Sequence, residues 1–458
     1  MSDGVTFTPD NRSLASSSDD GSGALWSVDD AHPRWRATRA GEAWSVTVNP
    51  EGDAVASGGG DGSIRVFRAI DGTTRLAFET RRLGVTALAF LPDGTSLLSS
   101  QASGQLAVWP LPRLGKVVPS PAELRETPAA ASTPSAACAR ASALLDAWTG
   151  EADVLAEVSR LAERAAARDD RAACAYVQEA RVAYRRGYEL GKAYRPEALD
   201  AAEALLDRAR TIDASLTAEH IARGWLLRAR KDDSGARREG LAAETLAPES
   251  APAHVLLATE AAEAGELERA EAYATQALAE RPTRGEAASA YQALEEAYAR
   301  GGDYDAASLA FENESKVLPE SAWVGPNYAS FLLEIGEIAK AVEVAKHAAD
   351  FRATPRAHAV LARVYVAVGN SWLWDTTLGP TELDRARKAF ERAIEQDPSA
   401  AGGHYGMAAY WRYVAVTRRD AEAARKAEGE LRLAEAAHDP LAAQMLDDER
   451  HVSDWLAK

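Results

Sequence analysis

The feature that most constrains this 458-residue chain is internal repetition with two different periods. Near the N-terminus one pattern occurs three times at spacings of 41 and 42 residues, marked by Pro9, Pro50 and Pro92. Further along, alanines recur every 34 residues, at Ala202, Ala236 and Ala270. A fixed period of roughly 20–50 residues indicates stacked copies of one small structural unit. Two periods therefore predict two different repeat arrays, one after the other.

Each N-terminal copy alternates apolar and polar residues, turns, and alternates again. The copies cover residues 5–26, 45–67 and 85–109, and the second reads SVTVNPEGDAVASGGGDGSIRVF. Alternation with period two, interrupted by turns rich in proline and glycine, predicts short antiparallel strands. The pattern resembles the WD40 repeat, in which about 40–45 residues form one four-stranded propeller blade.

The resemblance implies a turn aspartate that a preceding histidine binds. Asp20 and Asp61 occupy that position, Ser103 replaces it in the third copy, and no Gly-His pair precedes the second or third copy. Because propellers close with roughly 4–8 blades, three blades over residues 1–112 predict an incomplete, N-terminally truncated propeller. Its open strand edges predict self-association.

Two glycine- or proline-rich stretches need separate interpretations. Gly58–Gly62 lacks the Lys-Ser or Lys-Thr and the helix that follow a phosphate-binding loop, so we predict a turn between blade strands. Residues 110–136 contain six of the 20 prolines and no apolar periodicity. This composition predicts a semi-rigid linker over residues 113–136 rather than a domain.

From about Ala137 onward Ala, Leu, Glu and Arg dominate, and these residues favour helices. Proline stops helix propagation because it lacks an N–H group. Four of the predicted second helices each end at a proline, namely Pro248, Pro282, Pro319 and Pro398. The stretch LDRARKAFERAIEQDP (Leu383–Pro398) resembles the second half of the tetratricopeptide (TPR) consensus.

The TPR resemblance implies a superhelical solenoid of helix pairs over residues 137–440, with residues 441–458 as a helix that caps its exposed end. We expect repeats near 183–216, 217–250, 251–284, 288–321, 322–355, 355–398 and 401–440. The fold class is therefore multidomain β + α: incomplete WD40-like blades followed by an all-α TPR solenoid.

In proteins with similar repeats the first helices line a concave groove that binds a ligand. The groove-facing positions carry over to aromatic and arginine side chains, which are common energetic anchors of interfaces: Trp225, Arg228, Arg300, Arg363, Tyr405, Arg412 and Tyr413. The alternative is that Trp225 and Tyr405 pack against neighbouring repeats. Trp372 and Trp374, in an insertion over residues 371–382, either cover the solenoid or contact a partner, and we favour the first.

The sequence offers no set of residues for catalysis and no site for a metal or cofactor. His220, His254, His358 and His404 each occupy the fourth position of a repeat, where a large side chain packs within the repeat. Acidic pairs such as Glu295–Glu296 lie along helices, where runs of charge are usually solvated. Cys138 and Cys174 could pair, but we favour two small buried thiols, which suit a reducing cytosol.

The charge is uneven. Residues 1–116 carry 13 acidic and 11 basic side chains, so the remaining 56 acids and 41 bases give a charge of -15 out of -17. Such an acidic surface repels phosphates and anionic lipid, so we expect neither nucleic acid nor membrane as a partner. No stretch is long and apolar enough to span a bilayer and no secretory signal precedes the first blade, so we expect a cytoplasmic protein.

These features predict a non-catalytic scaffold that binds other proteins or peptide segments through the TPR groove and uses no cofactor. The alternative is the regulatory or sensor tail of a larger signalling enzyme. In that case a kinase or a nucleotide-hydrolysing switch domain would lie upstream or on another chain.

Overall fold

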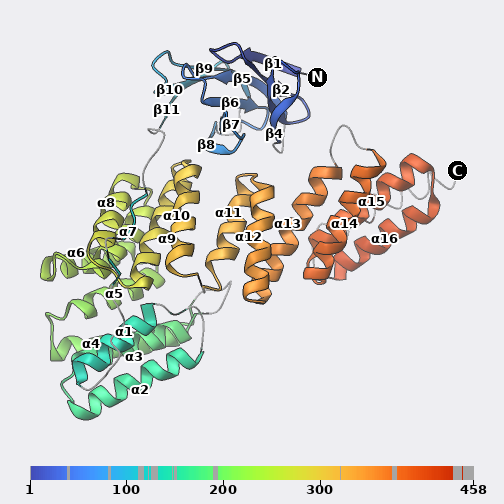
Figure 1. Ribbon diagram of the computed structural model, residues 1–458. Helices are drawn as coiled ribbons and strands as arrows, with labels where there is room; N and C mark the ends of the chain where they lie inside the picture. The colour runs from blue at the N-terminus through green and yellow to red at the C-terminus, as the bar shows by residue number, and fades with distance from the viewer. Residues whose placement is uncertain are drawn as a thin grey trace. The chain divides into compact units, whose positions relative to one another are not determined.

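The computed structural model describes residues 2–38, 42–80, 84–111, 118–121, 123–124, 133–146, 148, 152–188, 194–319, 321–373, 379–436 and 446. The chain divides into two compact units. Residues 1–114 and 322–458 form the first unit, and residues 115–321 form the second. Figure 1 shows open sheets at the N-terminus followed by a long region of stacked helix pairs, which confirms the predicted fold class.

The sheets are three antiparallel meanders whose strands neighbour one another in chain order. The first contains β1 (Ser2–Phe7), β2 (Ser13–Ser18), β3 (Ser22–Ser27) and β4 (Pro33–Thr38). The second contains β5 (Ala43–Val48), β6 (Ala54–Gly59), β7 (Ser63–Arg68) and β8 (Thr74–Glu79). The third contains β9 (Val85–Phe90), β10 (Ser96–Gln101) and β11 (Leu106–Pro110). Gly58–Gly62 thus forms the end of β6 and the turn to β7, as predicted.

The second turn of each blade depends on a glycine with positive φ. The φ values lie between 78° and 82° at Gly21, Gly62 and Gly104, in a region that glycine adopts without steric cost. The residue before each glycine accepts a hydrogen bond from the amide two residues later, and these acceptors are Asp20, Asp61 and Ser103. The predicted turn residues therefore brace their own turns, without a histidine.

Tryptophan side chains connect neighbouring strands within two blades. Trp26 Nε1 donates to Ser16 Oγ across β2 and β3 at 2.8 Å, and Trp109 Nε1 donates to Ser99 Oγ across β10 and β11 at 2.8 Å. In the second blade Phe67 occupies this position and packs on Trp35, with ring centroids 5.7 Å apart. The two tryptophan hydrogen bonds connect neighbouring strands within their blades, and the Trp35–Phe67 contact joins the first blade to the second.

Buried apolar side chains join each blade to the next, and the two outer blades keep an exposed apolar face. Leu25 and Val55 belong to the core shared by the first two blades, and Ile64 and Leu97 to the core shared by the second and third. Four large apolar side chains on the outer strands are more than half exposed, namely Val5, Phe7, Leu106 and Val108.

The helices pack as consecutive antiparallel pairs. Their bounds are α1 (Pro134–Asp146), α2 (Ala152–Arg168), α3 (Ala173–Arg186), α4 (Pro196–Ile212), α5 (Thr217–Ala229), α6 (Asp233–Leu246), α7 (Ala251–Glu263), α8 (Leu267–Ala279), α9 (Arg284–Arg300), α10 (Tyr304–Val317), α11 (Val324–Glu334), α12 (Ile338–Phe351), α13 (Pro355–Leu373), α14 (Pro380–Gln396), α15 (Ala401–Arg418) and α16 (Ala421–Ala436). None of the helices in the described ranges is long and apolar enough to cross a bilayer.

The predicted repeats from residue 217 onward coincide with the pairs from α5–α6 to α15–α16. The four prolines predicted to end second helices follow α6, α8, α10 and α14 within three residues. The repeat expected near 183–216 is displaced, because its first helix is α3 and begins at Ala173. The structure also adds α1–α2, a pair to which the 34-residue spacing assigned no repeat.

Small residues allow the helices of the second array to approach closely. A Cβ atom added to Gly406 of α15 would lie 2.1 Å from the Phe390 ring, and one added to Gly369 of α13 would lie 2.3 Å from the same ring. Phe390 of α14 is fully buried between them. Glycine is therefore required at both positions by packing, and not by backbone conformation.

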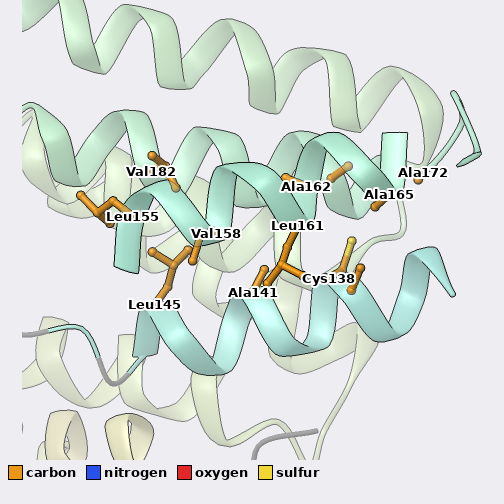
Figure 2. Close-up of a cluster of buried hydrophobic side chains, with 12 residues drawn as sticks. Cys138, Ala141, Leu145, Leu155, Val158, Leu161, Ala162, Ala165, Ala172 and Val182 are labelled. Carbon is orange, nitrogen blue, oxygen red and sulfur yellow. The ribbon is translucent and has the colours of Figure 1, made fainter. Parts of the chain in front are cut away.

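The two cysteines form a disulfide, so the prediction of two free thiols is wrong. Cys138 of α1 and Cys174 of α3 are bonded, with their Cα atoms 6.0 Å apart. Figure 2 shows Cys138 within the apolar cluster that joins α1, α2 and α3 and that includes Leu145, Val158 and Leu161. The two cysteines meet because α3 packs against α1 as well as α2, a long-range contact that sequence spacing does not reveal.

The predicted insertion over residues 371–382 is largely helical where it is described. Its first residues extend α13 to Leu373, and its last residues, from Pro380, begin α14. Most of the predicted capping helix over residues 441–458 lies outside the described residues. Leu446 is described, and it is buried against Ala408 and Leu431.

Candidate functional site

Trp225 and Arg228, the first two predicted anchors, lie on α5 and contact side chains of their own unit. The Arg228 guanidinium carbon lies 5.4 Å from the centroid of the Trp225 ring. Arg228 also pairs with Glu263 of α7, and its Nε lies 3.6 Å from Oε1 of Glu260. Arg228 is therefore already neutralised within the helical array.

Glu260 is the unusual member of this network, because its side chain is almost fully buried. Burial raises the pKa of Glu260 to about 7, and the neighbouring Arg228 charge opposes that rise. A carboxylate without a cation would be costly at this depth. Arg228 thus stabilises the buried Glu260 carboxylate, a structural role that its predicted groove-facing position does not indicate.

Glu295 and Glu314 form a buried acidic pair between α9 and α10, so the prediction of a solvated Glu295 is wrong. The exposed fraction is 7% for Glu295 and 1% for Glu314. Burial raises the pKa of Glu314 to about 7, and burial together with the Glu314 charge raises the pKa of Glu295 well above its ordinary value. Gln292 Nε2 donates to Glu314 Oε1 at 2.7 Å. The neighbour Glu296 is exposed, as predicted.

Arg300, another predicted anchor, lies at the C-terminal end of α9. Its side chain is 53% exposed and pairs with Glu296 one turn earlier on the same helix. Such exposed pairs on one helix contribute only about 0.3–0.5 kcal/mol. Arg300 can therefore exchange Glu296 for an acidic group of another molecule at little cost.

The remaining predicted anchors lie on α13 and α15, in the other unit. Arg363 of α13 and Tyr413 of α15 are exposed. Arg412 is half-buried. Tyr405 packs against the cluster that contains Leu431 of α16, which belongs to its own helix pair and not to a neighbouring repeat as the alternative expected. Helices α13 and α15 pack against each other, so exposed anchor groups occur on two neighbouring first helices.

Trp372 lies against the core of the first unit. It packs on the cluster around Leu373, Leu383 and Phe390, and the Arg385 guanidinium carbon lies 4.8 Å from its ring centroid. This placement agrees with the intramolecular role that we favoured for Trp372. Trp374 lies outside the described residues.

The four histidines at the fourth repeat position each hydrogen-bond to the second helix of their own pair or to its C-terminal end. The Nδ1 contacts measure 2.6–2.8 Å and join His220 to Glu239, His254 to Glu280, His358 to Gln396 and His404 to Glu430. The predicted packing role is thus correct, and the bonded partners are what sequence reasoning missed. No fixed spacing marks these partners, since they lie 19 to 38 residues downstream.

One of these histidines belongs to a set of side chains with metal-ligand character. Glu219, His220 and Glu239 place ligand atoms within 4.8 Å of one another. The Arg210 guanidinium already lies between the carboxylates, with Nη2 2.8 Å from Glu219 and 2.9 Å from Glu239. This set is therefore an ion-paired brace among α4, α5 and α6.

Comparison with known proteins supports the prediction of WD40 repeats in the N-terminal part. Residues 35–68 and 74–110 match the family model described as WD domain, G-beta repeat. The chain is 32% identical over 99 residues, 21% of its length, to Transcription initiation factor TFIID subunit 5 of Caenorhabditis elegans, of which it covers 15%. It is 34% identical over 68 residues, 15% of its length, to Periodic tryptophan protein 2 of Arabidopsis thaliana, of which it covers 8%.

A structure titled "Crystal structure of RRP9 WD40 repeats" is 23% identical, with a TM-score of 0.23, and the match covers 24% of this chain and 35% of that chain. The chain thus spans only a small part of the relatives that it matches. With the family match to residues 35–68 and 74–110 and the three meander sheets, the N-terminal part of the chain consists of WD40 repeats.

Proposed function

We propose that this chain is a non-catalytic protein-interaction scaffold that binds partner segments through a groove of its TPR-type helix pairs. The WD40 blades support the scaffold role, because such repeats present binding surfaces. The helical array supports the groove, since α5, α7 and α9 begin 34 and 33 residues apart and the first helices carry aromatic and arginine side chains. The exposure of Arg363 and Tyr413 on the neighbouring helices α13 and α15 carries the proposal.

Charge indicates the class of partner. The helical region is strongly acidic, but the exposed Arg363 would provide a local binding site for an acidic or apolar anchor of an extended segment. The corresponding first-helix anchors of α5 are engaged with Glu263 and Glu260. We therefore place partner binding on α13 and α15 before α5.

A peptide array of extended segments, probed with the full chain, tests this proposal. Replacing Arg363 and Arg412 by alanine should weaken the retained peptides by about 30-fold or more, because loss of a true anchor costs at least about 2 kcal/mol. Arg425→Ala is the matched control, since Arg425 is an exposed arginine on the second helix α16.

Retention of every peptide by the double variant would exclude the groove of α13 and α15. If replacement of Trp372 and Trp374 abolished binding instead, the insertion over residues 371–382 would be the binding surface. Circular dichroism confirms in each case that the helices remain folded.

The cytoplasmic location that the sequence predicts is also part of the proposal, and the disulfide provides its test. A reducing cytosol opposes disulfides, whereas Cys138 and Cys174 are bonded in the structure. Alkylation of thiols in intact cells, followed by mass spectrometry, should find both cysteines modified if the chain resides there.

A further inference from the structure

Part of the segment between the blades and the first helix lies against α9. Its described residues, Val118–Pro121 and Glu123–Leu124, belong to the same compact unit as α1–α10. Val118 is 4% exposed although it lies in neither a strand nor a helix. The Tyr291 hydroxyl donates to the Pro119 carbonyl at 2.9 Å.

Tyr291 differs from the other large side chains at the fourth repeat position. The Nδ1 atom of each of the four histidines binds within its own helix pair or at the end of that pair, whereas the Tyr291 hydroxyl binds a residue 172 positions earlier. Tyr291 is 1% exposed, and burial raises its pKa to about 12, so the hydroxyl keeps the proton that it donates. The Tyr291 hydroxyl is therefore a buried polar group of the helical array, and its hydrogen-bond partner is the segment.

A second contact fixes the direction of the segment. Glu123 pairs with Arg281 in the connection between α8 and α9, with Oε2 and Nε 2.9 Å apart. Both side chains are more than 60% exposed. This ion pair therefore contributes little to the affinity of the segment for the helices and mainly fixes its orientation. Pro119 and Pro121 favour the extended polyproline conformation, which leaves backbone carbonyls available and reduces the entropy lost on binding.

We propose that residues 118–121 and 123–124 occupy in cis a binding site on α9 for an extended proline-containing segment. A partner of the same chemistry would present an apolar residue, a proline directly after it and an acidic residue five positions after it. Such a partner must displace the chain's own segment. This inference rests on the proposed function, because it assigns that function a second groove, in the 115–321 unit, together with its ligand class and its regulation.

The tether sets how strongly the chain's own segment competes. A segment joined by a short linker has an effective concentration in the millimolar range. A free peptide of the same sequence therefore binds the intact chain only weakly. When the cis segment is expelled, the apparent affinity of the peptide should rise at least tenfold.

The test measures fluorescence anisotropy of a labelled peptide with the sequence of residues 116–126, titrated with the full chain. Val118→Asp places a charge at a buried position and should expel the segment, so the peptide should bind this variant at least tenfold more tightly than the unmodified chain. Ser120→Asp adds the same charge at an exposed position and should leave the affinity unchanged. Adding Tyr291→Phe to Val118→Asp should remove most of the gain.

Equal affinity for the unmodified chain and both aspartate variants would overturn the inference, as would an absence of binding to every variant whose circular dichroism is unchanged. Either result leaves the proposed function standing, because that function is tested separately through Arg363 and Arg412 in the other unit. Loss of peptide binding by Arg363→Ala and Arg412→Ala, with Val118→Asp still effective, would identify two independent grooves.

Discussion

Glu295 and Glu296 are neighbours in sequence, yet their surroundings on α9 differ completely. Glu296 is exposed and pairs with Arg300, whereas Glu295 faces α10 and meets Glu314. Two buried carboxyl groups in contact cannot both ionise cheaply, so they retain a proton that they would lose in the unfolded chain. The α9–α10 contact is therefore sensitive to pH.

We predict that stability of the 115–321 unit falls as the pH rises. The folded pKa of Glu314 is raised to about 7 and that of Glu295 is raised as well, so the stabilising proton is fully bound below the unfolded pKa, near 4.3. The contribution is lost as the pH rises through the folded pKa values. Glu295→Gln should weaken this dependence, because Glu314 stays buried, and should stabilise the unit by about 1–3 kcal/mol at pH 8.

Urea denaturation of the full chain between pH 5 and pH 8 measures this difference. Glu296→Gln is the control, because it removes a charge at an exposed neighbouring position and should keep the pH dependence of the unmodified chain. A difference between the unmodified chain and Glu295→Gln that stays constant across this range would contradict the prediction.

At the scale of helices and strands, local rules account for much of the fold. Period-two alternation predicts the blade strands, and prolines predict the ends of α6, α8, α10 and α14. Contacts between distant residues do not follow from such rules. The Cys138–Cys174 bond, the burial of Glu295 and the Tyr291–Pro119 contact each depend on which helix faces lie together. The sequence therefore indicates which candidate residues lie on first helices, but not which of them are already paired with other side chains of the same chain.

Two helical glycines of the first unit should respond in opposite ways to replacement by alanine. Gly406→Ala should destabilise by about 1–3 kcal/mol, because its Cβ would overlap the Phe390 ring. Gly429 of α16 has no atom within 4 Å of a Cβ position, so Gly429→Ala should stabilise by about 1 kcal/mol through helix propensity. Chemical denaturation of both variants measures the two effects, and equal changes would show that packing around Phe390 is looser than described.

The disulfide should stabilise the first three helices against unfolding. It closes a loop of 36 residues, so reduction should lower the free energy of unfolding of the 115–321 unit by about 2–4 kcal/mol. Thermal unfolding with and without a thiol reductant measures this change. A variant with alanine at Cys138 and Cys174 should not respond to the reductant, and an equal response of both proteins would indicate an effect elsewhere.

For the whole molecule, the three blades leave two apolar faces without a neighbouring blade. Val5 and Phe7 are exposed on one outer blade, and Leu106 and Val108 on the other. Because exposed apolar strands promote association, we predict that the mass of the full chain rises with concentration in light scattering after size exclusion.

Phe7→Asp combined with Val108→Asp should shift the chain towards the monomer. Ile70→Asp is the matched control, since Ile70 is 82% exposed in the turn between β7 and β8 and lies on neither face. Equal association by the unmodified chain and the double variant would place the self-contact outside the blades.

The histidine contacts of the helical array have a consequence for how such a chain can change in length. His220, His358 and His404 each place the Nδ1 bond inside one helix pair. When a gene segment encoding a whole pair is duplicated or deleted, donor and acceptor travel together, and neither is left buried alone. These three histidine bonds therefore survive a change in repeat number, whereas an exchange of single helices between pairs would leave a polar group without its partner.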